Sequence, residues 1–121
     1  MFTHLKKREG NVLAIKITGE ILEWEHNQLD RLIRESISER KSTRIFLVLE
    51  HYATLNSAEA LFEDMRMIKK HSEHIDRLAV VADRVWKRTW IGLFGLFSGI
   101  ETNFFEMEQI EAAYRWITQN E

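Results

Sequence analysis

Short apolar runs alternate along this chain with longer stretches in which apolar side chains recur at helical spacing. The runs at 45–49 and 78–82 are apolar at every position, which predicts strands buried on both faces. Leu13, Ile15 and Ile17 alternate with smaller or polar residues, which predicts a strand with one wetter face. The pattern as a whole predicts strands over 2–7, 12–18, 44–50, 78–82 and 102–105.

Helical periodicity fills the stretches between these strands. Leu29, Leu32, Ile33 and Ile37 share one face of the first such stretch, as expected of a helix that packs on a sheet. The later stretches are preceded by residues that cap helix N-termini, Asn56 and Asp83 among them. We expect helices over 24–40, 56–74, 84–99 and 108–120.

The order of these elements is β-β-α-β-α-β-α-β-α. A turn signal at 8–11 joins the first two strands as an antiparallel hairpin, and strands that alternate with helices favour parallel pairing with right-handed crossovers. We therefore predict a single α/β domain over residues 1–121. Its sheet is single, mixed and mostly parallel, with about five strands, the hairpin at one edge, four helices and a sequential strand order.

Composition excludes several classes of function. The 17 basic and 19 acidic residues of this 121-residue chain give a net charge of −2, so nucleic acid is not the expected partner. There is no cysteine, hence no disulfide or thiol chemistry. We expect no signal peptide and a cytoplasmic location, because the first residues lack an apolar core. The apolar run at 89–100 is shorter than the roughly 20 residues of a transmembrane helix.

Ligands of open α/β sheets bind beyond the carboxyl ends of the parallel strands. The predicted strands bring carboxylates and a histidine to that edge, with two tryptophans beside them: Glu20, Glu50, His51, Tyr52, Asp83, Glu106, Trp24 and Trp86. These groups could bind a metal or perform acid–base chemistry, with Glu20, His51 and Asp83 as the candidates. Helix capping explains the acids equally well, and no serine lies in a Gly-x-Ser-x-Gly motif. We therefore expect no enzyme, no cofactor and no metal.

The predicted helix 84–99 carries more apolar surface than a solvent-facing helix needs. Trp86, Trp90, Leu93 and Phe97 share one face, and Phe94 widens it. Such a stripe serves as core, as the lining of an apolar ligand pocket, or as an exposed docking face. Its candidate ligand-binding residues, together with those of the neighbouring loops, are Trp24, His51, Asp83, Trp86, Trp90, Leu93, Phe94 and Phe97.

Several segments resemble the SpoIIAA-like branch of the STAS superfamily, bacterial domains related to anti-sigma-factor antagonists. The resemblance covers nearly the whole chain and rests on the element order and on three segments. These are Arg77-Leu-Ala-Val-Val-Ala-Asp-Arg-Val-Trp86, Thr102-Asn-Phe-Phe-Glu106 and Ala112-Ala-Tyr-Arg-Trp116. This branch is also similar in fold to lipid-binding Sec14-type domains, and the resemblance therefore implies a binding or signalling module.

Antagonist domains carry an Asp-Ser-Ser-Gly-type motif after the central strand, and its second serine is phosphorylated. The matching stretch here has Asn56 in place of the aspartate and Ser57 in place of the first serine. Ala58 replaces the phosphorylated serine and Glu59 replaces the glycine, so the chain departs from the phosphorylation motif. The resemblance therefore implies Asn56 and Ser57 as the regulatory candidates.

The leading hypothesis is a non-enzymatic module that holds an apolar or amphipathic small molecule, or docks a regulatory protein, near residues 86–97. The alternative is an antagonist-type signalling module that acts through Ser57. Peripheral membrane contact is a variant of the first hypothesis. A homodimer would cover a sheet face that the helices leave bare.

Overall fold

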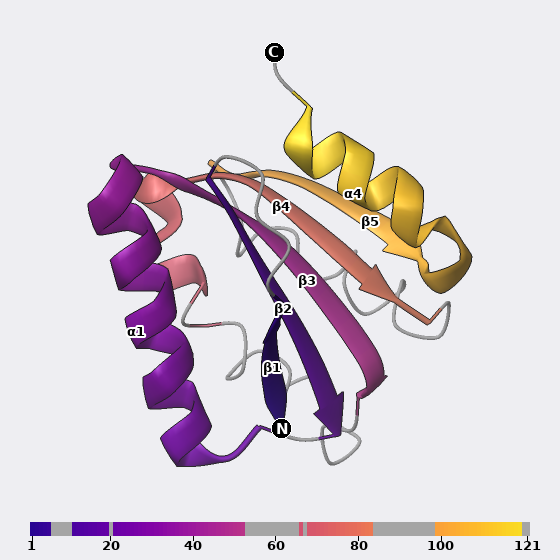
Figure 1. Ribbon diagram of the computed structural model, residues 1–121, viewed down its shortest axis with the longest axis horizontal. Coiled ribbons are helices and arrows are strands. Elements are labelled where there is room, and N and C mark those ends of the chain that lie inside the picture. Colours follow the sequence, from indigo (N-terminus) through magenta and orange to yellow (C-terminus); the bar gives the residue numbers. More distant parts are fainter. Residues whose placement is uncertain (6–10, 20, 53–65, 67, 84–98, 120–121) are drawn as a thin grey trace.

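The computed structural model describes residues 1–5, 11–19, 21–52, 66, 68–83 and 99–119. These residues form a five-stranded mixed sheet with helices on both faces (Figure 1). The elements are β1 (Phe2–Leu5), β2 (Val12–Gly19), α1 (Glu23–Arg40), β3 (Thr43–Tyr52), β4 (Ile75–Ala82), β5 (Glu101–Glu106) and α4 (Ile110–Thr118), with 3₁₀ turns at Ser72–His74 and Met107–Gln109.

The strand order is β1-β2-β3-β4-β5, which confirms the predicted sequential sheet. β1 pairs with β2 in antiparallel fashion, with Phe2 opposite Ile17, and every later pair is parallel. The arrowheads of β2, β3, β4 and β5 therefore point to one side of the molecule (Figure 1). We call that side the carboxyl edge, and the opposite side, where these strands begin, the amino edge.

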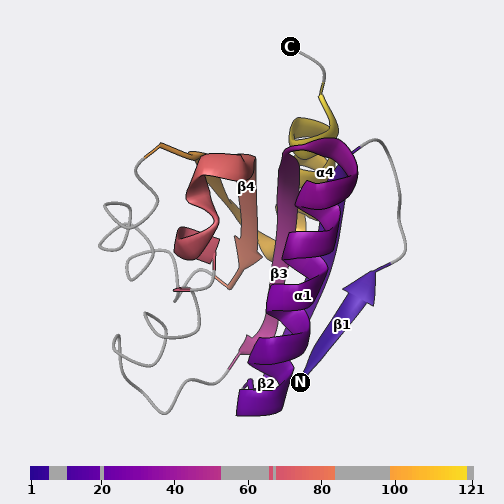
Figure 2. The same cartoon turned by 90° about the vertical axis from the view of Figure 1, so that its left-hand side faces the viewer.

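The sheet separates two apolar layers, with α1 in front of it and α4 behind it in Figure 2. Side chains of β2, β3 and β4 alternate between the layers, as strand geometry requires. The α1 layer contains Ile15, Leu47 and Leu78 packed with Leu29 and Ile33. The α4 layer is built from Ala14, Phe46, Val48, Ala79 and Val81 of the strands and from Ala113 and Ile117 of α4.

Boundaries of β3 and β4 and one burial prediction differ from the expectations. β4 begins at Ile75 and β3 reaches Tyr52, beyond the apolar runs that predicted them. β4 is longer because the polar residue Arg77 lies buried within it, which a search for apolar runs does not detect. Ala14, expected on the wetter face of β2, is buried because Phe46, Leu5 and Val12 belong to the same packed cluster.

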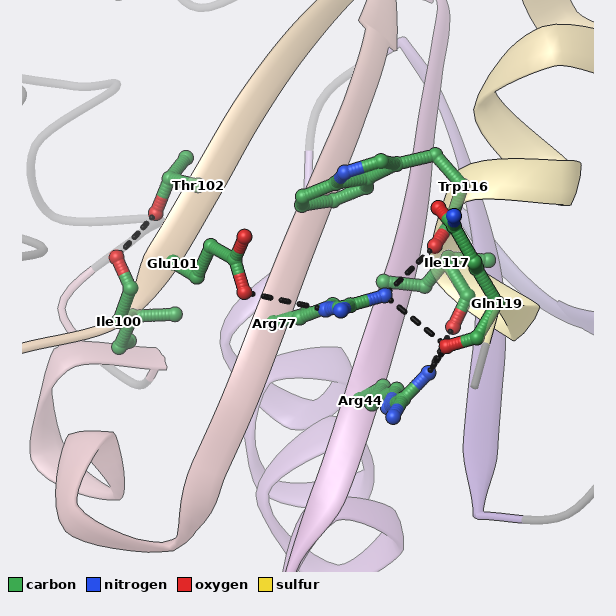
Figure 3. Close-up of polar contacts among 8 residues, drawn as sticks. All are labelled: Arg44, Arg77, Ile100, Glu101, Thr102, Trp116, Ile117 and Gln119. Carbon is green, nitrogen blue, oxygen red and sulfur yellow. Dashed lines mark hydrogen bonds and ion pairs between the residues drawn. The ribbon is translucent and has the colours of Figure 1, made fainter. Parts of the chain in front are cut away.

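Arg44 and Arg77 fasten the C-terminal end of α4 to the amino edge (Figure 3). The Nη1 atom of Arg77 donates to the carbonyl oxygens of Trp116 and Gln119, each at 3.0 Å. The Nη1 atom of Arg44 donates to the carbonyl oxygens of Ile117 at 2.9 Å and Gln119 at 2.7 Å. The last carbonyls of a helix lack partners within the helix, so the two cations complete its end and complement its dipole.

Arg77 makes two further contacts that make its burial tolerable. Its Nε atom donates to Glu101 Oε1 at 3.1 Å, and its guanidinium carbon lies 5.3 Å from the centre of a Trp116 ring. A buried cation is stable only when its donors are paired, and Arg77 is 6 % exposed. We call this group of Arg44, Arg77 and the C-terminal end of α4 the arginine clasp.

The predicted helix 84–99 and most of the predicted helix 56–74 lie outside the described residues. Residues 68–70 are helical, and the 3₁₀ turn Ser72–His74 then leads into β4. None of the helices in the described part of the chain combines the length and the hydropathy that a membrane crossing requires.

Candidate functional site

The carboxyl edge is where the large exposed hydrophobic side chains of the described residues lie. Trp24 is 57 % exposed and Leu22 48 % exposed at the start of α1, and Ile110 is 38 % exposed at the start of α4. Met1 is 67 % exposed, and its ammonium donates to the carbonyl oxygen of Thr18 near the end of β2. Leu22 and Trp24 lie two positions apart at the start of α1, and neighbouring exposed apolar side chains of this kind mark a surface for a partner. Ile110 belongs to α4, on the opposite face of the sheet (Figure 2).

A buried carboxylate holds part of this surface in place. Glu25 is 3 % exposed, and its Oε2 atom accepts from the backbone N–H of Phe2 at 2.9 Å. Its Oε1 atom accepts from the backbone N–H of Leu22 at 3.0 Å and lies 3.4 Å from the Met1 ammonium. A single side chain therefore fixes the first strand against the start of α1, next to Leu22 and Trp24.

Glu25 is ionised at neutral pH because its partners outweigh its burial. Burial by itself raises the pKa of the carboxyl. The backbone N–H groups of Leu22 and Phe2 act in the other direction, as does the Met1 ammonium, and together they leave the pKa of Glu25 below its ordinary value. The first turn of α1 adds the positive end of a helix dipole to this environment.

Backbone geometry turns the chain at this edge. Gly19 ends β2 with a φ of +67°, a conformation that residues with a Cβ rarely adopt. The register of the β2–β3 pair shifts at the same point, so that Gly19 lies opposite Tyr52. The link from β2 to α1 therefore emerges beside the end of β3.

Three of the predicted ligand-binding residues lie in the described part of the chain. Trp24 is at the start of α1, His51 is next to last in β3, and Asp83 is exposed directly after β4. All three belong to the carboxyl edge, although β2, which leads to α1, and β4 are separated by β3 in the sheet. The remaining candidates lie outside the described residues: Trp86, Trp90, Leu93, Phe94, Phe97, Asn56 and Ser57.

Two of the predicted acids at this edge, Glu50 and Glu106, take part in structural contacts, and the third that the structure describes, Asp83, is exposed. The Glu50 carboxylate pairs with Lys16 Nζ at 3.2 Å across β2 and β3. Glu106 precedes the 3₁₀ turn Met107–Gln109, and its backbone N–H donates to Gln109 Oε1 at 3.0 Å. Among the described residues, no three histidine or acidic side chains are grouped as metal ligands would be. Glu20, one of the three acid–base candidates, lies outside that part.

Sequence reasoning missed Glu25 and Leu22. Glu25 was recognisable only as an early acid that suits the helix dipole, a role that an exposed glutamate fills equally well. Its partner Phe2 lies 23 positions away in the chain. Leu22 gives no signal either, because a single apolar residue before a helix is as often buried as exposed.

Comparison with known proteins gives a consistent result. A family model described as SpoIIAA-like matches residues 12–118. A crystal structure of an uncharacterized protein from the DUF3478 family of Shewanella loihica PV-4, described as having a SpoIIAA-like fold, superposes with a TM-score of 0.69. The alignment is 19 % identical and covers 96 % of this chain and 93 % of that one. A search of curated proteins finds no significant match to the sequence.

Proposed function

Because the chain belongs to the SpoIIAA-like family, we propose that it is a non-enzymatic regulatory module that binds an apolar or amphipathic partner at the carboxyl edge of its sheet. Domains of this kind are generally non-catalytic, which favours a binding role over an enzymatic one. The proposed site combines the described residues Trp24, His51 and Asp83 with residues 86–97 of the segment that follows β4.

The observation that carries the proposal is the exposure of Trp24 beside Leu22 at the start of α1. Burying one large apolar side chain is worth about 1.5–3 kcal/mol, so leaving two of them in water forgoes stability that the fold alone could have used. A partner that covers them gains this free energy on binding. Glu25 keeps the segment ordered in advance, which lowers the entropy cost of binding.

The partner is either a regulatory protein that docks on this surface or an amphipathic small molecule whose apolar part reaches residues 86–97. Both place apolar surface against Trp24. For the protein, a photo-crosslinking amino acid at position 24 should give a discrete crosslinked species in cells, whereas the same amino acid at the exposed Glu39, near the far end of α1, should not. Identical crosslinking patterns at the two positions would count against docking.

The small-molecule form of the proposal has its own measurement. Native mass spectrometry of protein purified from cells, followed by organic extraction, should show an added mass that is released as an apolar compound. Oleate or a lysophospholipid should then raise the melting temperature of the stripped protein. A clean apo mass, no thermal shift and no crosslink at position 24 would together refute the proposed function.

One feature favours the alternative of an antagonist-type signalling module. β3 is the middle strand of the sheet, and its carboxyl end leads to Asn56 and Ser57, which match the start of the antagonist motif. Incubation in cell extract with ATP, followed by peptide mass spectrometry, should then show phosphate on Ser57. An unmodified Ser57, with the partners captured by Ser57→Ala unchanged, would remove this alternative.

A further inference from the structure

A second candidate site lies away from the carboxyl edge, in a cleft of about 640 Å³ beside α1. Its lining comes from two segments that are distant in the sequence: His26, Asn27 and Asp30 of α1, and Arg66, Lys69 and Lys70 of the segment that precedes the 3₁₀ turn Ser72–His74. This volume falls within the range of roughly 300–1,000 Å³ that is typical of small-molecule sites. All six of these residues are polar or charged types, whereas the exposed residues Leu22 and Trp24 at the carboxyl edge are apolar or aromatic.

The two walls of the cleft are joined at Asp30. Its Oδ1 atom lies 2.8 Å from His71 Nε2 and 3.6 Å from Lys70 Nζ, and its Oδ2 atom accepts from Arg34 Nε at 2.9 Å. Burial raises the pKa of Asp30, but His71, Lys70 and Arg34 outweigh it and lower the pKa below its ordinary value. The Asp30 carboxylate is therefore ionised, and it holds the basic segment against α1.

Basic side chains outnumber acidic ones among the described residues that line the cleft. Arg66, Lys69 and Lys70 are the basic ones, and Asp30, the acidic one, pairs with Lys70 and with Arg34 from outside the cleft. Lys69 is exposed and has no ion-pair partner among the described residues. The spacing of 66, 69 and 70 puts three like charges on one helix face, which costs a few tenths of a kcal/mol per pair. This group of basic side chains occurs in a chain whose net charge is −2.

From this arrangement we propose that the cleft between α1 and residues 66–70 binds a small phosphate-bearing group. Lysine and arginine side chains supply charge-assisted donors for phosphate oxygens. The Asn27 amide, on the opposite wall, adds a neutral donor and gives the site a polar surface for the rest of the ligand. The phosphate belongs either to a soluble phosphorylated molecule or to a phospholipid headgroup, and the recognition chemistry is the same for both.

Lys69 provides the sharpest test, because its ammonium has no ion-pair partner in the part of the chain that the structure describes. Inorganic pyrophosphate should bind the wild-type protein saturably in calorimetric titration, and Lys69→Glu should weaken that binding about tenfold, the value of one charge-assisted contact. Arg115→Glu on α4, behind the sheet, changes the net charge equally and should leave the affinity unchanged. Lys69→Gln, which adds no carboxylate next to Asp30, serves if Lys69→Glu melts early.

A second pair of probes separates the two sources of phosphate. Vesicles that contain phosphatidylglycerol should co-sediment with the protein if the ligand is a lipid headgroup, and vesicles of phosphatidylcholine alone should not. Loss of co-sedimentation in Lys69→Gln would assign the contact to this cleft. The proposal fails if neither pyrophosphate nor phosphatidylglycerol binds, or if Arg115→Glu weakens binding as much as Lys69→Glu does. These results do not depend on Trp24, so the site stands or falls separately from the proposed function.

Discussion

The two edges of the sheet use their large side chains in opposite ways. At the amino edge, polar side chains are buried: Arg77 is 6 % exposed and Thr43 is fully buried, with its hydroxyl 2.7 Å from that of Ser36. At the carboxyl edge, Trp24 and Leu22 extend outward into solvent. The amino edge therefore stabilises the fold, and the carboxyl edge leaves apolar surface available for a partner.

Energetics give the same contrast. The Nη1 atoms of Arg44 and Arg77 each donate to two carbonyl oxygens at the end of α4, so removing a clasp residue should cost stability. Removing Trp24 exposes no unsatisfied group and should cost little. Substitutions at the amino edge should therefore lower the free energy of unfolding, whereas Trp24 substitutions at the carboxyl edge should weaken partner binding.

The largest loss of stability is expected for Arg77→Leu. It removes donors to Trp116, Gln119 and Glu101, and it leaves partly buried carbonyl groups at the end of α4 less well paired. We expect the free energy of unfolding in urea to fall by about 3 kcal/mol. Arg77→Lys keeps the charge but not the forked geometry and should lose an intermediate amount. A loss as small as that of the exposed control Arg115→Leu would show that the clasp contributes nothing.

Arg44→Leu should destabilise the protein by about 2 kcal/mol, less than Arg77→Leu. Its Nε atom is buried with no hydrogen-bond partner in the described part of the chain, so part of the arginine's contribution is already offset. Both arginines donate to the carbonyl oxygen of Gln119, so their effects should not add. Strict additivity in a double-mutant cycle would contradict the shared acceptor.

Glu25→Gln should cost about 1–2 kcal/mol at neutral pH, because the amide cannot replace a carboxylate that accepts two backbone N–H bonds. The pKa of Glu25 is lowered in the folded state, so its contribution is present above the unfolded pKa of about 4.3 and is lost as the pH falls through the folded value.

The stability of Glu25→Gln should therefore depend less on pH in acid than that of the wild type. Some dependence should remain, because Asp30 also has a lowered pKa. Urea unfolding at a series of acidic pH values measures the difference, and parallel curves for the two proteins would contradict an ionised, hydrogen-bonded Glu25.

The smallest effect on stability is expected for Trp24→Ala, within about 0.5 kcal/mol of the wild type, because the side chain is more exposed than buried. The same substitution should abolish partner capture at the carboxyl edge. Arg77→Lys, studied at a temperature where it is folded, should leave capture intact and serves as the reciprocal control. A large loss of stability in Trp24→Ala would place this residue with the structural side chains.

The architecture could be predicted because its signals are local. The apolar runs at 45–49 and 78–82 can be satisfied only by strands covered on both faces, and alternation with helices leaves few topologies other than a parallel sheet. Asp83 and Trp24 could be placed at the carboxyl edge for the same reason, because Asp83 directly follows a predicted strand and Trp24 begins a predicted helix. The prediction of an apolar pocket depends on residues 84–98, which lie outside the described residues. It therefore stays a prediction.

The sequence by itself determined the order of the elements and the edge at which a partner is expected, since periodicity and turn chemistry act between near neighbours. The sequential strand order had no such local signal, and the tertiary structure established it. Only the tertiary structure decided which charged residues are buried. The Glu25 carboxylate accepts a hydrogen bond from the backbone N–H of Phe2, 23 positions away in the chain. Arg44 donates a hydrogen bond to the carbonyl oxygen of Gln119, 75 positions away. From the sequence alone, a charged residue is expected to be exposed, because burying a charge is tolerated only where hydrogen-bond or ion-pair partners surround it. The fold decides where those partners lie.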